Sequence, residues 1–363
     1  MFDIITFGSA SEDIVVKPKN LTVLKYEKDS VENDGVCFPL GSKIDVEQIM
    51  FNTGGGGTNT AATFALQGFK TAFYGKIGKD NAGQEIIKEL KNLKVNTGFV
   101  FTTNAKPTNH SIVILSNTND RTILAYRGAA ELLDKKEILW NKLKTKWIYL
   151  APLSGLLCLP RSESADSTTG ATTPFEDIVN FAKENKIKLA VNPGIAQLSL
   201  PNFSEIVKKI DILFLNQEEA SFLTKMPITN ENEIFKKLDQ MCSGILVMTK
   251  GGEGVVVSDG KYIYSAKPPQ NRGVVDTTGA GDSFGSGFIA EFMRPFDSHS
   301  ADSGQAAQGE SARIEKSIQL GMANSVGCIS QIGAKNGLLK KGQEFERVLV
   351  TKEECDNNLC LVK

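Results

Sequence analysis

Short apolar runs alternate along most of the chain with stretches in which apolar residues recur every three or four positions. A helical spacing of this second kind is clear over 86–93 and over 311–331. Continuous apolar runs of strand length are typical of strands buried on both faces. The alternation therefore predicts an α/β fold with a mainly parallel sheet covered by helices on both faces. The runs expected as buried strands are 2–9, 147–153, 188–194 and 211–216.

Composition and charge exclude several functional classes. Of 363 residues, 41% are hydrophobic and 23% charged, and the formal net charge is −1. No global field would then attract nucleic acid or an anionic membrane. Because the start has no signal peptide and no run reaches the ~18–20 apolar residues of a membrane span, a cytoplasmic protein is expected. The six cysteines form no C-x-x-C pair, and with only two histidines they predict free thiols instead of a zinc site.

The densest motif is GVVDTTGAGDSFGSGF at 273–288. Its apolar start stops at Asp276, and small residues lead into a helix-like continuation, which predicts a strand, a tight turn and a helix. The amides of Ala280, Gly281 and Asp282 would open that helix, where unpaired N–H groups and the helix dipole favour an anion. A carboxylate at an anion site is explained if Asp282 accepts a proton from a hydroxyl whose oxygen attacks a phosphate.

The residues of this motif also allow other functional interpretations. Asp282 alone is also typical of a helix N-terminal acid that stabilises by about 0.3–1 kcal/mol. Residues 281–285 match the G-x-S-x-G nucleophile elbow of hydrolases, but the one histidine downstream, His299, lies in a polar run. A dinucleotide-binding G-x-G-x-x-G fails at Phe284. The hydrolase and dinucleotide interpretations are therefore disfavoured.

Three further stretches offer ligand contacts. The four glycines at 54–57 precede a small-residue helix, in which Asn59 offers a donor and an acceptor to a polyhydroxylated ligand; a flexible loop is the alternative. Asn216 and Glu219 stand between a strand and a helix in an N-x-x-E pattern that is also typical of a helix cap. Taken alone, the glycine-rich stretch 249–254 indicates a hairpin turn.

Together these motifs resemble the ribokinase (PfkB-type) family of sugar and nucleoside kinases, over roughly residues 2–340. DTTGAGDSF resembles the second signature of that family. The first signature, Gly-Gly-x-Gly-x-Asn, is matched by Gly54, Gly55, Gly57 and Asn59. The resemblance implies a three-layer ribokinase-like fold, with a central and mostly parallel sheet, helices on both faces, and a small β-sheet lid over the substrate.

The resemblance also implies a role for each matching residue. Asp282 is the expected general base, beside an anion hole formed by Gly279, Ala280 and Gly281. ATP is expected at Asn216, Glu219, Thr249, Gly251 and Gly254, with Glu219 near Mg²⁺ through water. The expected substrate contacts are Asp13, Gly55, Asn59 and Arg127, although an arginine at a strand edge is more commonly just exposed. Some members bind a monovalent cation such as K⁺, a position matched by Asp276 and the Thr278 carbonyl, with Cys328, Gln331 and Gly333 as weaker carbonyl candidates.

One kinase domain is expected over 1–345, with a peripheral C-terminal segment over 346–363. Two polar, low-complexity stretches read as surface insertions within that domain. The resemblance further implies a homodimer formed through the lid. The lid is expected from about 13–50 and 98–128, and the insertions are 161–173 and 296–311.

The sequence thus predicts ATP-dependent phosphotransfer to a hydroxyl of a small sugar, with no nucleic-acid or membrane partner. A nucleoside kinase is the nearest alternative, because the two groups share these motifs and differ in the lid. A non-catalytic sugar or nucleotide sensor on the same fold is a further alternative, and the presence of Asp282 argues against it.

Overall fold

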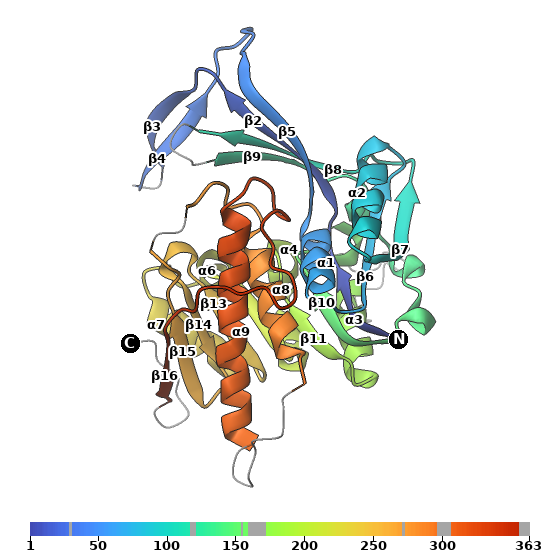
Figure 1. Ribbon diagram of the computed structural model, residues 1–363, viewed down its shortest axis with the longest axis vertical. Helices are drawn as coiled ribbons and strands as arrows, with labels where there is room; N and C mark the ends of the chain where they lie inside the picture. The colour runs from blue at the N-terminus through green and yellow to red at the C-terminus, as the bar shows by residue number, and fades with distance from the viewer. Residues whose placement is uncertain are drawn as a thin grey trace.

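Ten strands form the main sheet in the computed structural model, which describes residues 1–28, 31–116, 121–153, 155–158, 172–270, 273–295 and 306–355 (Figure 1). The strand order is β16-β15-β14-β13-β12-β11-β10-β1-β6-β7. The strands from β7 to β13 in that order are parallel, and β14, β15 and β16 continue the sheet antiparallel. The strands are β1 (Phe2–Phe7), β6 (Thr71–Gly78), β7 (Asn96–Thr103), β10 (Thr145–Leu150), β11 (Lys188–Val191), β12 (Ile212–Asn216), β13 (Ile245–Thr249), β14 (Val255–Ser258), β15 (Tyr262–Ala266) and β16 (Val350–Glu354).

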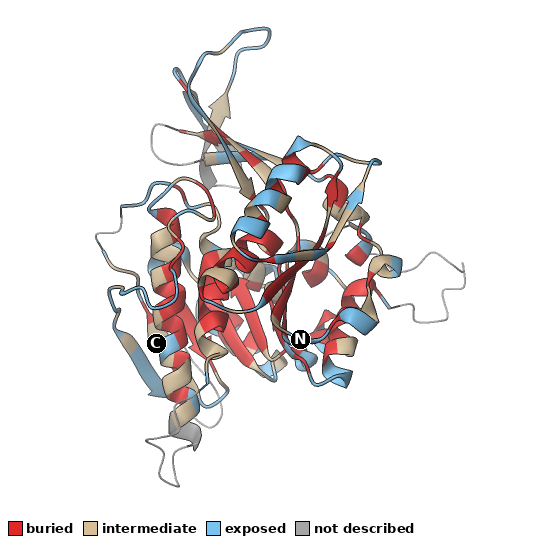
Figure 2. Cartoon of the chain, turned by 45° about the vertical axis from the view of Figure 1, so that its right-hand side comes forward, coloured by how far each residue is buried: buried red, intermediate tan, exposed pale blue. Residues whose placement is uncertain are grey.

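Helices cover both faces of this sheet, as the alternating pattern predicted (Figures 1 and 2). Successive strand residues point to opposite faces, so Leu213 packs in one core and Phe214 in the other, each at most 3% exposed. One core contains side chains of α3, α6 and α7, and the other contains side chains of α1, α8 and α9. The helices are α1 (Gly56–Leu66), α2 (Asn81–Asn92), α3 (Pro174–Glu184), α4 (Ile195–Leu198), α5 (Phe203–Ile206), α6 (Gln217–Thr224), α7 (Glu231–Met241), α8 (Ala280–Phe292) and α9 (Ala306–Ile329), with 3₁₀ turns at Ala129–Leu132, Lys135–Glu137, Trp140–Lys142, Gly155–Cys158, Val207–Lys209 and Gly251–Glu253.

A separate four-stranded sheet, in the order β5-β2-β8-β9, forms the lid above one end of the main sheet (Figure 1). A two-stranded ribbon of β3 and β4 extends from it. The predicted lid is confirmed as a small separate sheet, but residues 98–103 were wrongly included in it. They belong to β7, which pairs with β6 in the main sheet because Phe99 is buried against Tyr74, with the ring centroids 5.2 Å apart. The lid strands are β2 (Ser11–Pro18), β3 (Thr22–Lys28), β4 (Val31–Cys37), β5 (Val46–Gly54), β8 (Asn109–Leu115) and β9 (Arg121–Tyr126).

Two other predicted elements differ from the structure. No strand is present at 273–275, where Val274 and Val275 are 36% and 42% exposed and the Val275 amide donates to the Ile329 carbonyl at 2.8 Å. Conversely, the C-terminal segment is not wholly peripheral, because β16 pairs with β15 along the edge of the main sheet. Both errors concern short segments whose state depends on a distant partner for backbone hydrogen bonding.

The remaining expectations concern thiols, insertions and surface. Cys37, Cys242 and Cys328 are free, but Cys355 is in a disulfide, so the prediction of free thiols is wrong there.

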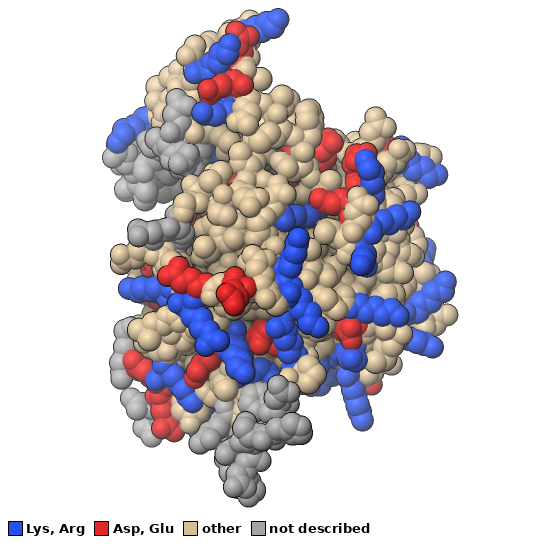
Figure 3. All heavy atoms as spheres, in the orientation of Figure 1, with Lys and Arg blue, Asp and Glu red and all other residues tan. Residues whose placement is uncertain are grey.

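The insertions lie outside the described residues, except that Thr173 caps α3 and residues 306–311 begin α9. In the described part of the chain, no helix is both long and apolar enough to cross a bilayer. Acidic and basic side chains are intermixed over the lower part of the face shown in Figure 3.

Candidate active site

The two glycine-rich motifs meet at one carboxylate. Asp282 lies in the first turn of α8, and Asn59 of α1 donates from Nδ2 to Asp282 Oδ2 at 2.8 Å. Asp282 Oδ1 also lies close to the glycine run, because a Cβ on Gly56 would be only 3.3 Å from it. Burial raises the pKa of Asp282, the Asn59 hydrogen bond lowers it, and the charge of Asp13 raises it again. A half-buried carboxylate of raised pKa, with one oxygen held by an amide, is suited to accept a proton.

The turn before α8 presents backbone amides to open space. Gly279 is left-handed, with φ 78°, and a Cβ there would lie 2.5 Å from the Ala334 side chain. The amides of Gly281 and Asp282 have no acceptor among the described residues, and nothing lies within 4 Å of a Cβ built on Gly281. The Ala280 amide differs from expectation, because it donates to the Thr277 carbonyl at 3.3 Å. Two free amides at a helix N-terminus can hold an anion.

These amides border a cavity of about 200 Å³. The predicted nucleotide residues Thr249, Gly251 and Gly254 line it together with Ala280 and Gly281. Gly254 requires glycine, since its φ is 104° and a Cβ would lie 2.0 Å from the Ala266 carbonyl oxygen. An apolar cleft that ends in free amides can accept a flat base with attached phosphates. The sequence did not point to the remaining lining residues, which are Gly252, Pro268, Val274, Thr277, Phe284, Met322, Ser325, Val326 and Ile329.

The last helix explains part of that omission. Met322, Ser325 and Ile329 follow a helical spacing that predicts a core-facing side. Met322 and Ile329 are indeed buried, but all three line the cavity beside α8. Periodicity cannot distinguish a side chain facing the core from one facing a ligand cleft, so this pattern held no signal of its own.

Asn216 and Glu219 lie beside the same cavity. Asn216 ends β12 and is the register partner of Thr249 on β13. Both form the predicted cap, in which the Asn216 amide donates to Glu219 Oε2 at 2.9 Å and the Glu219 amide donates to Asn216 Oδ1 at 2.8 Å. Burial raises the pKa of Glu219, and the charges of Glu218 and Asp282 raise it further. No cluster of three metal-binding side chains occurs in the described part of the chain, so direct protein ligation of a metal finds no support there.

Asp13 is one of the residues predicted to contact the phosphate acceptor. It is 6% exposed, and Ser11 Oγ donates to its Oδ1 at 2.8 Å. Its other oxygen packs against Gly54, where a Cβ would lie 1.9 Å from Oδ2. Burial raises the pKa of Asp13, while hydrogen bonds from Ser11 and Ser111 and the charge of Lys335 lower it. This carboxylate is therefore held at the root of the lid, facing the glycine run.

The other predicted acceptor contacts divide into two groups. Asn59 is buried, and its Oδ1 has no hydrogen-bond donor in the part of the chain that the structure describes. Gly55, with φ 96°, caps α1 beside it. Arg127 follows β9 and is exposed, so the structure gives no contact that brings it to Asp282. An unpartnered buried acceptor costs free energy unless a ligand or water donates to it.

The residues predicted for a monovalent cation are together but bind one another. Asp276 is buried, and its Oδ1 accepts from the Thr278 amide at 2.9 Å and from the Thr278 hydroxyl at 2.6 Å. Its Oδ2 accepts from the Gly333 amide at 2.9 Å. The Thr278 carbonyl accepts from Cys328 Sγ at 3.5 Å. Three of the roughly four lone-pair positions of this carboxylate are therefore used by the protein.

The surroundings of Ser283 argue against a nucleophile elbow. Its hydroxyl is buried and donates to the carbonyls of Gly279 and Ala280, at 2.8 and 2.9 Å. His299, the candidate base of that interpretation, lies outside the described residues. A nucleophile elbow needs an exposed hydroxyl next to a base, so the hydrolase interpretation has no support here.

Comparisons with known proteins identify relatives of this chain. The profile described as "pfkB family carbohydrate kinase" matches residues 28–341. A ribokinase from Lactococcus lactis is 29% identical over 305 residues, which cover 83% of this chain and 87% of the relative. Ribokinase from Giardia lamblia has a similar structure, with a TM-score of 0.70, 18% identity, and coverage of 94% of this chain and 98% of that one.

Two other solved structures also resemble this chain. Arabidopsis thaliana ribokinase complexed with ribose and ATP has a TM-score of 0.66 and 23% identity, and covers 93% of this chain and 96% of its own. Adenosine kinase from Sinorhizobium meliloti has the same TM-score with 21% identity, and covers 92% and 95%. At these identities the likeness concerns the fold.

The lidded three-layer fold and the matched relatives define the class of protein, a phosphotransferase that acts on an alcohol group. Because the family profile spans most of the sequence, this chain belongs to the pfkB family of carbohydrate kinases.

Proposed function

We propose that this chain transfers the γ-phosphoryl group of ATP to a hydroxyl of a small sugar. The observation that carries the proposal is Asp282, a half-buried carboxylate of raised pKa that Asn59 holds at 2.8 Å beside the free amides that open α8. A base and an anion site next to each other are what phosphotransfer to an alcohol requires.

In this mechanism the acceptor hydroxyl loses its proton to Asp282 while its oxygen forms a bond to the γ-phosphorus. The bond between that phosphorus and the bridging oxygen of ADP breaks. The amides of Gly281 and Asp282 stabilise the charge on the transferred group. The Asn59 side-chain NH₂ group holds Asp282 Oδ2, the oxygen that does not take the proton. The unpartnered Oδ1 of Asn59 accepts a hydrogen bond from another hydroxyl of the sugar. A positioned general base supplies about 10²–10⁴ in rate.

Magnesium is proposed near Glu219, where it would offset phosphate charge. The cap occupies Glu219 Oε2, and Oε1 remains for a water bound to the metal. This role through water agrees with the lack of a three-ligand cluster among the described residues. The fit for potassium is poor, because Asp276 and the Thr278 carbonyl are largely satisfied by the protein. No step is assigned to that cation, and equal activity in sodium and potassium buffers would agree with its absence.

A sugar acceptor is favoured over a nucleoside by the polarity of the site. The groups around Asp282 on the lid side are Asp13, Asn59 and glycine backbone, which suit a molecule with several hydroxyls. The apolar cavity lies on the other side, next to Thr249 and Gly251. The similar structures include a ribokinase complexed with ribose and ATP and an adenosine kinase, so the experiment tests both acceptor classes.

ADP release measured across pentoses, hexoses and nucleosides tests this proposal. Turnover with a sugar, lost in Asp282→Asn, supports it. Turnover with nucleosides alone would replace the sugar by the alternative acceptor. Tight binding of one compound without any ADP release would indicate a sensor and refute the kinase proposal.

A homodimer through the lid is proposed from the outer face of that sheet. Phe51, Ile14, Ile112 and Leu124 are register neighbours across the four strands. Phe51 is 63% exposed and Leu124 is 54% exposed. A row of exposed apolar side chains on a sheet is typical of a protein interface. Light scattering of Phe51→Glu against the wild type should show a dimer becoming a monomer; equal masses would contradict this interface.

A further inference from the structure

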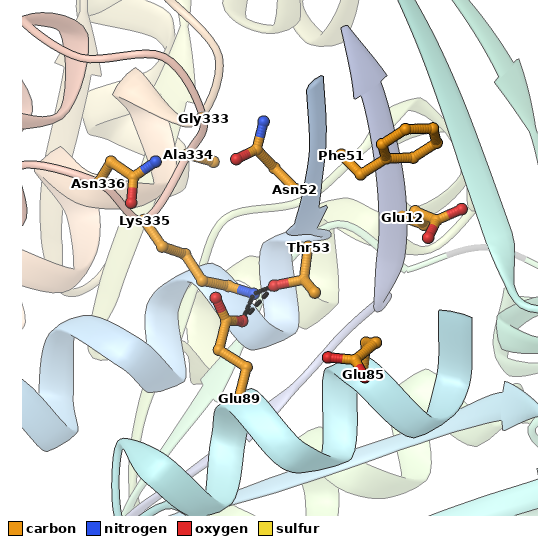
Figure 4. Close-up of a pocket in the computed structure, with 10 residues that line it drawn as sticks. All are labelled: Glu12, Phe51, Asn52, Thr53, Glu85, Glu89, Gly333, Ala334, Lys335 and Asn336. Carbon is orange, nitrogen blue, oxygen red and sulfur yellow. Dashed lines mark hydrogen bonds and ion pairs between the residues drawn. The ribbon is translucent and has the colours of Figure 1, made fainter. Parts of the chain in front are cut away.

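A buried lysine outside the predicted site joins three parts of the structure (Figure 4). Lys335 lies in the loop after α9, and only 6% of its side chain is exposed. Its Nζ donates to Glu89 Oε2 of α2 at 2.6 Å and to Thr53 Oγ1 of β5 at 2.6 Å. The Thr53 hydroxyl also donates to Glu89. Elements that are far apart in the sequence therefore meet at one ammonium group.

On the lid side, this contact leads directly to the acceptor. Thr53 is followed by Gly54, whose backbone packs against Asp13 so closely that a Cβ would lie 1.9 Å from Asp13 Oδ2. Gly54 is in turn followed by the left-handed Gly55, which begins the helix that carries Asn59. A displacement of Thr53 would therefore move the groups proposed to hold the sugar.

On the other side, the contact leads to the anion turn. Lys335 is two residues after Gly333, whose amide donates to Asp276 at 2.9 Å. Asp276 holds the amide and hydroxyl of Thr278, which immediately precedes Gly279. The loop carrying Lys335 therefore supports the backbone that presents the free amides. One side chain connects the lid root to the phosphate side of the site.

This contact borders an open space at the lid root. A cavity of about 310 Å³ lies beside Lys335, between β5, α2 and the loop after α9. Figure 4 shows Lys335, Glu89 and Thr53 converging at one side of this cavity, while Phe51 and Glu12 lie farther away across it. Gly333 of the same loop also packs against Asn52 of β5, since a Cβ there would lie 3.0 Å from the Asn52 side chain, and the polar contact of Lys335 adds to this packing between the strand and the loop.

Stability alone explains this buried charge poorly. Burial lowers the pKa of Lys335, and the charges of Glu89 and Asp13 oppose that shift. Burying an ion pair carries a desolvation penalty that its attraction often fails to repay, so apolar replacements are frequently as stable. What such a pair does provide is a fixed direction, since each hydrogen bond is satisfied in one arrangement only.

We propose that Lys335 is a positioning residue, which holds the root of the lid in register with the anion turn so that the acceptor hydroxyl meets Asp282. The inference rests on the proposed phosphotransfer. It assigns to Lys335 no contact with the substrate. Its effect passes through Thr53 to the sugar-binding backbone and through Gly333 to the turn.

Steady-state kinetics on three variants test this role. Thr53→Val removes the hydroxyl without changing the size of the side chain, and should raise the acceptor KM about tenfold while the ATP KM stays within about twofold. Lys335→Met should show a larger loss in kcat/KM for the acceptor. Lys340→Met, an exposed lysine in the same segment, is the matched control and should behave as wild type. An unchanged acceptor KM in Thr53→Val, with only a lower Tm in Lys335→Met, would overturn the proposal.

Amide hydrogen exchange gives a readout that does not depend on turnover. In the wild type, the acceptor sugar and a non-hydrolysable ATP analogue should slow exchange over residues 46–54. Thr53→Val should lose that protection if Lys335 positions the lid root, and equal protection in both proteins refutes the role. If the wild type phosphorylates no acceptor, the proposed function itself fails; if it phosphorylates one and Thr53→Val keeps the protection, only the role of Lys335 fails.

Discussion

The turn before α8 and the lid are built in opposite ways. In the turn, Asp276 is buried and bonded to Thr278, and Gly279 is left-handed and packs against Ala334. The strands of the lid are mostly half-buried or exposed, whereas the central strands of the main sheet are mostly buried (Figure 2). The lid contacts the rest of the protein at its root, near Asp13 and Thr53.

This difference separates the turn, which is proposed to carry the chemistry, from the lid, which is proposed to select the acceptor. The transferred group is the same for every acceptor, so the groups that hold it benefit from rigid, preorganised backbone. The acceptor varies, and a partly exposed sheet accepts substitutions at little cost in stability. In this protein, Asn59 and Lys335 connect the two regions, through Asp282 and through Thr53 respectively.

The largest expected effect is on the rigid side. Asp282→Asn should lower kcat by about 10²–10⁴, because the proton acceptor is lost. At pH 4 the Tm should stay nearly unchanged, since asparagine Oδ1 can accept the same hydrogen bond from Asn59. Glu218→Gln, which removes an exposed acid next to Glu219, is the control and should stay within about twofold of the wild-type kcat. A stability loss with activity retained would mean that Asp282 is only a helix-end acid.

The packing beneath the turn should be equally intolerant. A Cβ on Gly285 would lie 2.5 Å from the buried hydroxyl of Tyr149, so Gly285→Ala should lose about 1–3 kcal/mol in the free energy of unfolding by urea. Adding Tyr149→Phe should restore most of that loss by removing the clashing oxygen. Gly273→Ala, where a Cβ meets nothing within 4 Å, is the control. No recovery in the double variant would show that the cost arises elsewhere.

On the lid side, Asp13→Asn should affect binding more than chemistry. Losing a charged acceptor for sugar hydroxyls should raise the acceptor KM about tenfold, with a smaller change in kcat. The ATP KM should not move, because Asp13 is not among the residues that line the nucleotide cavity. Initial rates at varied sugar and fixed ATP measure both constants. A kcat loss as large as that of Asp282→Asn would contradict the proposal that Asp13 acts mainly in binding and Asp282 in the chemical step.

The smallest effect should appear in the pH profiles. Burial raises the pKa of Asp282 above its ordinary value of 3.8, so kcat/KM should fall on the acid side with a midpoint above that value. The raised pKa has the opposite effect on folding stability, which falls as pH rises. The unfolded state releases this proton at a lower pH than the folded state, so the carboxyl destabilises the fold as pH rises through the raised pKa. The Tm of Asp282→Asn relative to wild type should therefore improve from pH 4 to pH 7; a parallel shift of both proteins would contradict the raised pKa.

The sequence anticipated the features that depend on local chemistry. The strand–helix alternation predicted the α/β fold and its parallel sheet, which is confirmed. The Asn216 and Glu219 cap was predicted from four residues, because a cap is made within one turn of helix. The roles proposed for the site residues stay predictions until the variants are measured.

Features that depend on distant partners were missed. The chain near 98–103 has the same β-rich composition as the lid strands, and its place beside β6 follows only from the burial of Phe99. No motif singled out in the sequence includes Lys335, yet it bonds to a residue 282 positions away. No spacing in the sequence relates those two positions.

What the amino-acid sequence determined by itself was the local backbone: where glycine must adopt a left-handed conformation, where a helix opens, and which carboxylate stands there. Only the tertiary structure decided which of these pieces face one another, and it added the buried ammonium that joins them. The physical reason is that backbone conformation is set by near neighbours. The partners of a buried charge are set by the packing of the whole chain.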